Sequence, residues 1–229
     1  MRLKLFFMSI ITVMLMYVPF IGTFLRIINT MIHETGHALI TLFTNGDVTR
    51  IELFSNLEGV TFTKYSLWIS GFLSGISGYV FASMMAFLCI LLWKKGKYKW
   101  MIHLLLYISV INLIFWVRNV YGILWLVCFI PFLIYLLVQK SQRFLENITL
   151  ILSILLITTS FMSTIDILVL SLISSGRAGD ATFLNSITYV PTLIWSILFF
   201  LQALFFAYIS IKTVLPRKNK IVEKNIVHY

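Results

Sequence analysis

Long, uninterrupted apolar runs are the feature that most limits how this chain can fold. Six of them reach or approach the roughly 20 residues that a helix needs to cross a bilayer, and they cover residues 5–25, 66–93, 100–116, 120–139, 148–173 and 183–211. Apolar residues make up 60% of the chain and charged residues only 11%. That balance excludes a soluble globule, a disordered chain and a coiled coil. The sequence therefore predicts an all-α polytopic membrane protein with about six transmembrane helices.

Three segments near the N-terminus differ from the later apolar runs. No small-residue cleavage site follows residues 5–25, so this run is expected to remain as a span with a kink near Pro19. Residues 30–44 are too few for a comfortable crossing and predict a short, half-inserted helix. Residues 47–65 show β-type alternation on either side of a turn and predict a small β hairpin. We expect a single membrane domain over residues 1–211, followed by a basic tail over 212–229.

The net charge of +10 comes mainly from short basic clusters between the apolar runs. Basic loops beside membrane spans set topology, so the charge indicates a lipid bilayer and no nucleic-acid partner. The positive-inside rule predicts cytoplasmic N- and C-termini, and it places these segments in the cytoplasm: residues 1–4, 94–99, 140–147 and the tail. The hairpin and the 174–182 loop are then expected on the external side.

One motif carries recognisable chemistry: His33-Glu34-Thr35-Gly36-His37 has the HExxH pattern. Residues four apart share one face of a helix, so His33 and His37 can bind one Zn²⁺. Glu34 borders that face without being spaced as a ligand, and its carboxylate can act as a general base. Ionisable residues within apolar helices are costly and usually functional. The motif therefore predicts a zinc site with Glu34 as a catalytic residue.

A catalytic zinc takes a third protein ligand, and the residues alone leave its identity open. His103 follows a basic loop and His228 lies in the tail, so a carboxylate is the better expectation. Glu146 falls on the opposite side in the predicted topology. Asp166, within a span, and Asp180, before the last span, both remain candidates, although Asp166 is expected mainly to pair with a polar partner inside the bundle.

The segment from Met31 to Asp47 resembles the site-2-protease group of membrane zinc metalloproteases, and in particular its short bacterial branch. Other matching features are a Gly before the second hairpin strand, a Gly-rich span, an Arg-Asn pair and a late Asp-Ala step. In this chain they are Glu58-Gly59-Val60-Thr61, Ser70-Gly71 with Ser74-Gly75, Arg118-Asn119 with Gly122, and Gly179-Asp180-Ala181 with Leu184 and Pro191. The Leu-Asp-Gly step of better-known members is absent.

The resemblance implies that Asp180 is the third zinc ligand and that the chain hydrolyses peptide bonds in a bacterial cell membrane. For Arg118 and Asn119 two interpretations stay open. The pair can form an interfacial loop in which the arginine reaches toward the headgroups. Alternatively, Asn119 is a catalytic residue that donates to the substrate carbonyl or the oxyanion.

These observations lead to the hypothesis of a zinc-dependent intramembrane metalloprotease acting on membrane-anchored proteins or peptides. Such a substrate must be extended, because the carbonyl groups of a helix are already bonded internally. The alternative is a non-enzymatic transporter or scaffold with a structural metal. The absence of paired repeats argues against transport, and a structural zinc would need four protein ligands.

Overall fold

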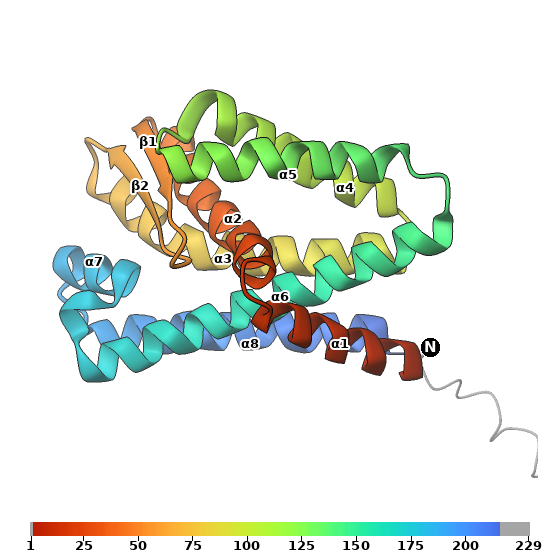
Figure 1. Cartoon of the computed structure of the whole chain (residues 1–229). Coiled ribbons are helices and arrows are strands. Elements are labelled where there is room, and N and C mark those ends of the chain that lie inside the picture. Colours follow the sequence, from red (N-terminus) through yellow and green to blue (C-terminus); the bar gives the residue numbers. More distant parts are fainter. Residues whose placement is uncertain (1, 216–229) are drawn as a thin grey trace, which may run out of the picture.

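The computed structural model describes residues 2–215, so most of the predicted basic tail lies outside the described residues. The elements follow the apolar runs of the sequence (Figure 1). In chain order they are α1 (Arg2–Tyr17), α2 (Ile21–Phe43), β1 (Asp47–Leu53), β2 (Gly59–Lys64), α3 (Trp68–Lys94), α4 (Tyr98–Ile111), the π-helical turn η1 (Asn112–Trp116), α5 (Val120–Val138), α6 (Gln142–Ile173), the 3-10 turn η2 (Ser175–Arg177), α7 (Gly179–Thr188) and α8 (Thr192–Val214).

The predicted fold class is confirmed. Five helical segments are long and apolar enough to cross a membrane: α3, α4 with η1, α5, α6 and α8. The bent pair α1 and α2 gives up to a sixth span. The only sheet among the described residues is the predicted hairpin, with β1 and β2 antiparallel. The chain is an all-α polytopic membrane protein with a small β hairpin.

The break between α1 and α2 corrects the predicted extent of the HETGH helix. That helix begins at Ile21, not near residue 30, and it turns by 100° from the direction of α1. The predicted kink near Pro19 becomes a full interruption, with Phe20 in a left-handed conformation at φ 63°. A Cβ at Gly22 would lie 2.1 Å from the carbonyl oxygen of Met16, so the tight turn requires glycine there.

The predicted single helix over residues 183–211 is also wrong, because the chain is divided there between α7 and α8. Tyr189 ends α7 in a left-handed conformation at φ 60°. Pro191 cannot donate a backbone hydrogen bond and sits at the N-cap of α8. In the same way α6 begins at Gln142, earlier than expected, because Ser141 caps it by accepting a hydrogen bond from Phe144 N–H.

The ends of the helices fall into two groups (Figure 1). The start of α1, the α3–α4 turn, the α5–α6 turn and the end of α8 lie at one end of the bundle. The hairpin and α7 lie at the other end. This is the grouping that the basic clusters predict, since Lys94, Lys95 and Lys97 occur at the first end and the HETGH helix leads to the hairpin at the second.

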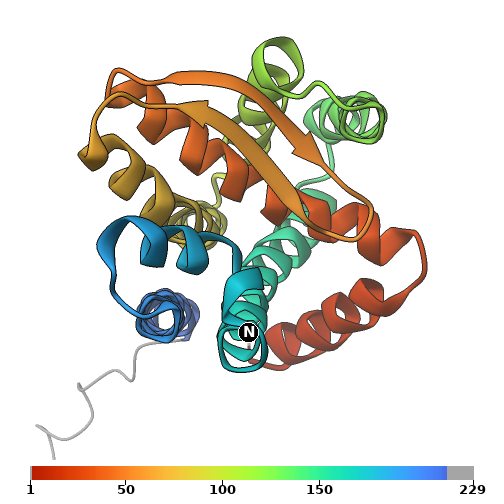
Figure 2. The same cartoon turned by 90° about the vertical axis from the view of Figure 1, so that its left-hand side faces the viewer.

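The hairpin lies along α2, and α7 lies beside the start of α8 (Figure 2). The outer edge of β1 is not free. Ile51 forms a parallel bridge with Val117, and its carbonyl accepts a hydrogen bond of 3.1 Å from Arg118 N–H. The Arg118 guanidinium itself donates to the backbone carbonyls of Phe115 and Val117 at 2.7 and 2.8 Å, closing the end of η1.

Small residues of α3 allow α2 to pack closely against it. Ser70, Gly71, Ser74, Gly75, Ser77 and Gly78 are all buried. A Cβ at Gly36 of α2 would lie 3.0 Å from the Ser77 carbonyl oxygen and 3.3 Å from Gly78 Cα. The small-residue stripe predicted from the sequence is therefore the surface that meets the HETGH helix.

Candidate metal centre

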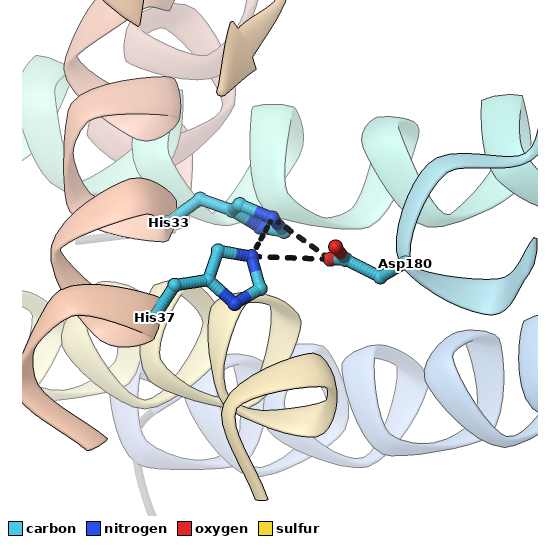
Figure 3. Close-up of side chains that lie close together, drawn as sticks. All are labelled: His33, His37 and Asp180. Carbon is cyan, nitrogen blue, oxygen red and sulfur yellow. Dashed lines mark hydrogen bonds and ion pairs between the residues drawn. The ribbon is translucent and has the colours of Figure 1, made fainter. Parts of the chain in front are cut away.

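His33 and His37 project from one face of α2, as their spacing predicts (Figure 3). Their Nε2 atoms are 3.0 Å apart. Helix α2 runs from Ile21 to Phe43 without a proline, so both histidines lie well inside it. The helix thus presents two nitrogen donors toward one point.

Asp180 reaches the same point from the opposite direction (Figure 3). Its Oδ2 is 3.1 Å from Nε2 of His33 and 3.2 Å from Nε2 of His37. The aspartate lies in the first turn of α7, where Ala181 and Leu184 are buried in a small apolar cluster. Leu184 packs against α3 at Gly75, and this contact fixes the depth to which α7 approaches α2.

These three donors suit a metal ion. Donors about 2.0–2.2 Å from a tetrahedral zinc stand about 3.3 Å from one another, close to the three separations found here. Among residues 2–215 this is the only such group of histidine, cysteine and acidic side chains. Burial tends to raise the pKa of Asp180, but attraction to His37 and hydrogen bonds from His33 and His37 hold that pKa well below its ordinary value. The carboxylate is therefore an anionic donor.

Contacts with α3 orient the second histidine and leave room beside it. Nδ1–H of His37 donates to the Ser74 carbonyl at 2.7 Å, which directs Nε2 toward Asp180. Gly78 lies next to the donors, since a Cβ there would be 2.5 Å from Nε2 of both histidines. Tyr79 packs edge-on against the His33 ring at 4.5 Å. Helix α3 thus forms one wall of the metal group.

Glu34 is held by the hairpin. Thr61 of β2 donates a hydrogen bond of 2.6 Å to Glu34 Oε2, and Glu34 is only 4% exposed. A Cβ at Gly59 would lie 2.6 Å from Glu34 Oε1, so glycine is needed where the strand passes the carboxylate. The second hairpin strand therefore fixes the carboxylate beside the two histidines.

A cavity of about 700 Å³ opens onto these groups. Its walls come from α2, the hairpin, α3, α6 and α7, and His33, Glu34, His37 and Asp180 all line it. Thr159, Ser163 and Asp166 recur at helical spacing on α6 and face the same space. Polar and charged side chains from several elements therefore face one chamber, in a bundle that exposes many large apolar side chains.

The structure does not bring Asn119 to this chamber. Its side-chain oxygen accepts from Leu53 N–H at 3.1 Å and its amide donates to the Leu53 carbonyl at 2.6 Å. Asp166 is exposed to the chamber, and nothing within residues 2–215 gives it the polar partner expected from the sequence. His103 bonds to the Lys99 carbonyl and Glu146 to Lys4, both away from the metal group. His228 lies outside the described residues.

The contacts that Thr61, Ser74 and Gly78 make with the site were not predicted from the sequence. Thr61 and Ser74 stand in segments that were recognised, a strand and a small-residue helix, but their partners lie 27 and 37 residues away. Of the three residues, Gly78 had the clearest sequence signal for a close contact. It belongs to a glycine series in an apolar helix, where each glycine marks a close approach.

An HExxH helix that meets a distant carboxylate inside a membrane bundle is typical of membrane metallopeptidases. The family whose sequence pattern matches the chain is described as Peptidase M50B-like, and the match covers residues 6–210. The chain belongs to this family, which is the site-2-protease family. Comparison with curated proteins and with solved structures gives no match.

Proposed function

We propose that this chain is a zinc-dependent intramembrane protease that hydrolyses peptide bonds of membrane-anchored proteins or peptides. The observation that carries the proposal is the convergence of His33, His37 and Asp180 beside Glu34 in one chamber. Three protein ligands with an open side are the arrangement of catalytic zinc, whereas structural zinc has four. Within residues 2–215 the donor group has three members, which favours an enzyme over a scaffold.

His33, His37 and Asp180 would hold the ion in this proposal. Zn²⁺ lowers the pKa of water and polarises a carbonyl when it is bound. Glu34 takes a proton from the attacking water and later gives it to the amine nitrogen as the carbon–nitrogen bond breaks. The hydrogen bond from Thr61 holds the carboxylate in place beside the chamber.

The free edge of the hairpin suits an extended substrate. Ile51 and Leu53 direct their peptide groups away from β2, toward residues 118 and 119. Their cross-strand partners Thr61 and Gly59 therefore direct their own peptide groups to the opposite edge. Gly59 and Thr61 also line the chamber, so a substrate strand added to β2 would pass the metal group.

Asn119 contributes to this arrangement from a distance. Its two hydrogen bonds to Leu53 occupy the edge of β1 and leave β2 as the edge for strand addition. A direct catalytic role of Asn119 stays a prediction. In the position described here, Asn119 acts as a positioning residue for the hairpin.

For location, we propose a multi-pass protein of the bacterial cell membrane with cytoplasmic N- and C-termini. The grouping of the basic turns at one end of the bundle supports this orientation (Figure 1). The metal group then lies nearer the external side, with the hairpin and α7.

The test compares metal content and peptide cleavage for purified wild type and Glu34→Gln. Gln has the same shape as Glu but cannot act as a base, so we expect bound zinc to remain and cleavage to fall at least 1,000-fold, of the order of a lost general base. Glu52→Gln is the matched control, because Glu52 is on the hairpin, pairs with Arg50 and does not line the chamber. Near-normal cleavage by Glu34→Gln would refute the mechanism.

A further inference from the structure

The face of α2 that carries the histidines continues toward its N-terminus with two more polar residues. Arg26 and Asn29 line the same chamber as His33 and His37. They precede His33 by seven and four residues, which are helical spacings that keep side chains on one face. The chamber thus has a second polar end, two helical turns from the metal group.

Asn29 is buried and Arg26 is half-buried, and each has one buried polar atom without a hydrogen-bond partner among the described residues. Asn29 is 6% exposed, and its Oδ1 has no hydrogen-bond donor. Nε of Arg26 is buried and has no acceptor. An unpaired charge in a membrane protein is expensive. A ligand that satisfies both groups would present an anion to Arg26 and an adjacent N–H group to Asn29 Oδ1.

The acids that line the chamber are engaged elsewhere or belong to another wall. Glu34 bonds to Thr61, Glu58 accepts from Asn56, and Asp180 contacts the histidines. Asp166 lies on α6, and no ion pair joins it to Arg26 among the described residues. Because no acid of the chamber forms an ion pair with Arg26 among the described residues, a carboxylate on a molecule that enters the chamber could pair with it.

We propose that Arg26 and Asn29 form a substrate subsite that binds a carboxylate, with Asn29 accepting the adjacent peptide N–H. The proposal rests on the proposed protease function and assigns part of its specificity. A carboxylate of this kind is either an acidic side chain or the C-terminal end of the substrate chain. The planar guanidinium of arginine is well suited to it, since it can bind both carboxylate oxygens at once.

The position along the substrate follows from the packing of β2. Gly59 lies beside Thr30 and Glu34, whereas Lys64 lies near Thr41 through Gly46, so β2 runs in the same direction as α2. An antiparallel strand added to β2 would then point its carboxyl-terminal part toward Arg26. Seven residues of helix rise about 10.5 Å, and an extended peptide advances about 3.4 Å per residue. The carboxylate therefore belongs about three residues after the cleaved bond.

The experiment uses the purified full-length protein and four peptides that share one cleavable sequence. One pair has Asp or Asn three residues after the cleaved bond, and the other ends there in a free carboxylate or an amide. We expect kcat/KM to be about 10–100-fold higher for the acidic member of at least one pair, as a charge-assisted hydrogen bond implies. The pair that shows the difference identifies whether a side chain or a chain end is bound.

Variants connect this preference to the subsite. Arg26→Gln should remove the preference while cleavage of the neutral peptides continues, and Arg26→Lys should retain part of it. Arg177→Gln is the matched control, because Arg177 lines the same chamber from η2, is exposed, and should leave the preference in place. Wild type without a preference, or Arg26→Gln with an undiminished one, would overturn the proposal.

Binding separates this proposal from the protease function. The dissociation constants of the same peptides are measured with Glu34→Gln protein, which should bind without cleaving. Tighter binding of the acidic peptides that disappears in the Glu34→Gln/Arg26→Gln double variant supports the subsite even if no cleavage is ever observed. Cleavage without any such difference in binding or rate retains the protease and refutes the subsite.

Discussion

Gly78→Ala should disrupt the metal group, although it adds only one methyl group and Gly78 lies on α3, not on the helix that carries the histidines. The added Cβ would lie 2.5 Å from Nε2 of both His33 and His37. Ordinary contacts of a carbon atom are about 3.5 Å or longer, so the overlap is about 1 Å. Helix α3 cannot retreat easily from α2, because it also packs against α6 and α8.

The displacement exceeds what the metal group can absorb. Zinc–nitrogen bonds are about 2.0–2.1 Å and tolerate about 0.2 Å, whereas the rings must move by several times that amount. We expect zinc affinity to fall at least 100-fold, and stability to fall by about 1–3 kcal/mol, as in other overpacked sites. Cleavage should be lost together with the metal.

Zinc affinity is measured by competition with a chelator, and helix content and thermal unfolding report on folding. Gly176→Ala is the control, because a Cβ there meets no atom within 4 Å and its backbone needs no glycine. A folded Gly78→Ala protein that binds zinc as tightly as wild type would show that Gly78 is not beside the ion and that the donor geometry described here is wrong.

Three further predictions concern the third ligand, the base and the orientation. Asp180→Asn should abolish tight zinc binding because it removes the anionic donor, whereas Asp166→Asn should retain zinc. Metal analysis that shows the reverse would mean that Asp166, and not Asp180, is the third ligand. Thr61→Val should retain zinc but lower kcat about tenfold by releasing Glu34 from a charge-assisted hydrogen bond, and an unchanged kcat would refute this role. A cysteine at position 175, introduced in place of Ser175 after the native cysteines are replaced, should react with an impermeant reagent from outside intact cells; reaction only after permeabilisation would reverse the orientation.

Apolar run length predicted most of the helices because crossing a bilayer leaves few alternatives. Proline marked the position near residue 19, but the sequence did not predict a bend of 100°, since hydropathy contains no information on direction and α1 and α2 are both apolar. The division between α7 and α8 had a local signal. Pro191 follows the polar stretch Asn185-Ser186, and the steric rule for proline outweighs the apolar residues on either side.

The parts of the site that depend on contacts between distant segments could not be predicted from local sequence patterns. The spacing of His33 and His37 is a property of one helix, so the sequence alone defined it. Asp180 was expected through a family resemblance, because spacing carries no information about residues 143 or more positions away. For Asn119 the sequence suggested a donor to substrate, and its hydrogen bonds to Leu53 depend on a hairpin register that no local pattern predicts.

The separation of the ligands along the chain has a consequence for biosynthesis. His33 and Asp180 are 147 residues apart, so the donor set cannot be complete until α7 has left the ribosome. At typical synthesis rates of about 5–20 residues per second, this interval lasts about 7–30 s. During that time the early helices carry the two imidazoles and the Glu34 carboxylate but lack Asp180. Under the proposed function, a nascent or truncated chain that stops before α7 is therefore inactive, and hydrolysis becomes possible only when the last two helices have entered the membrane.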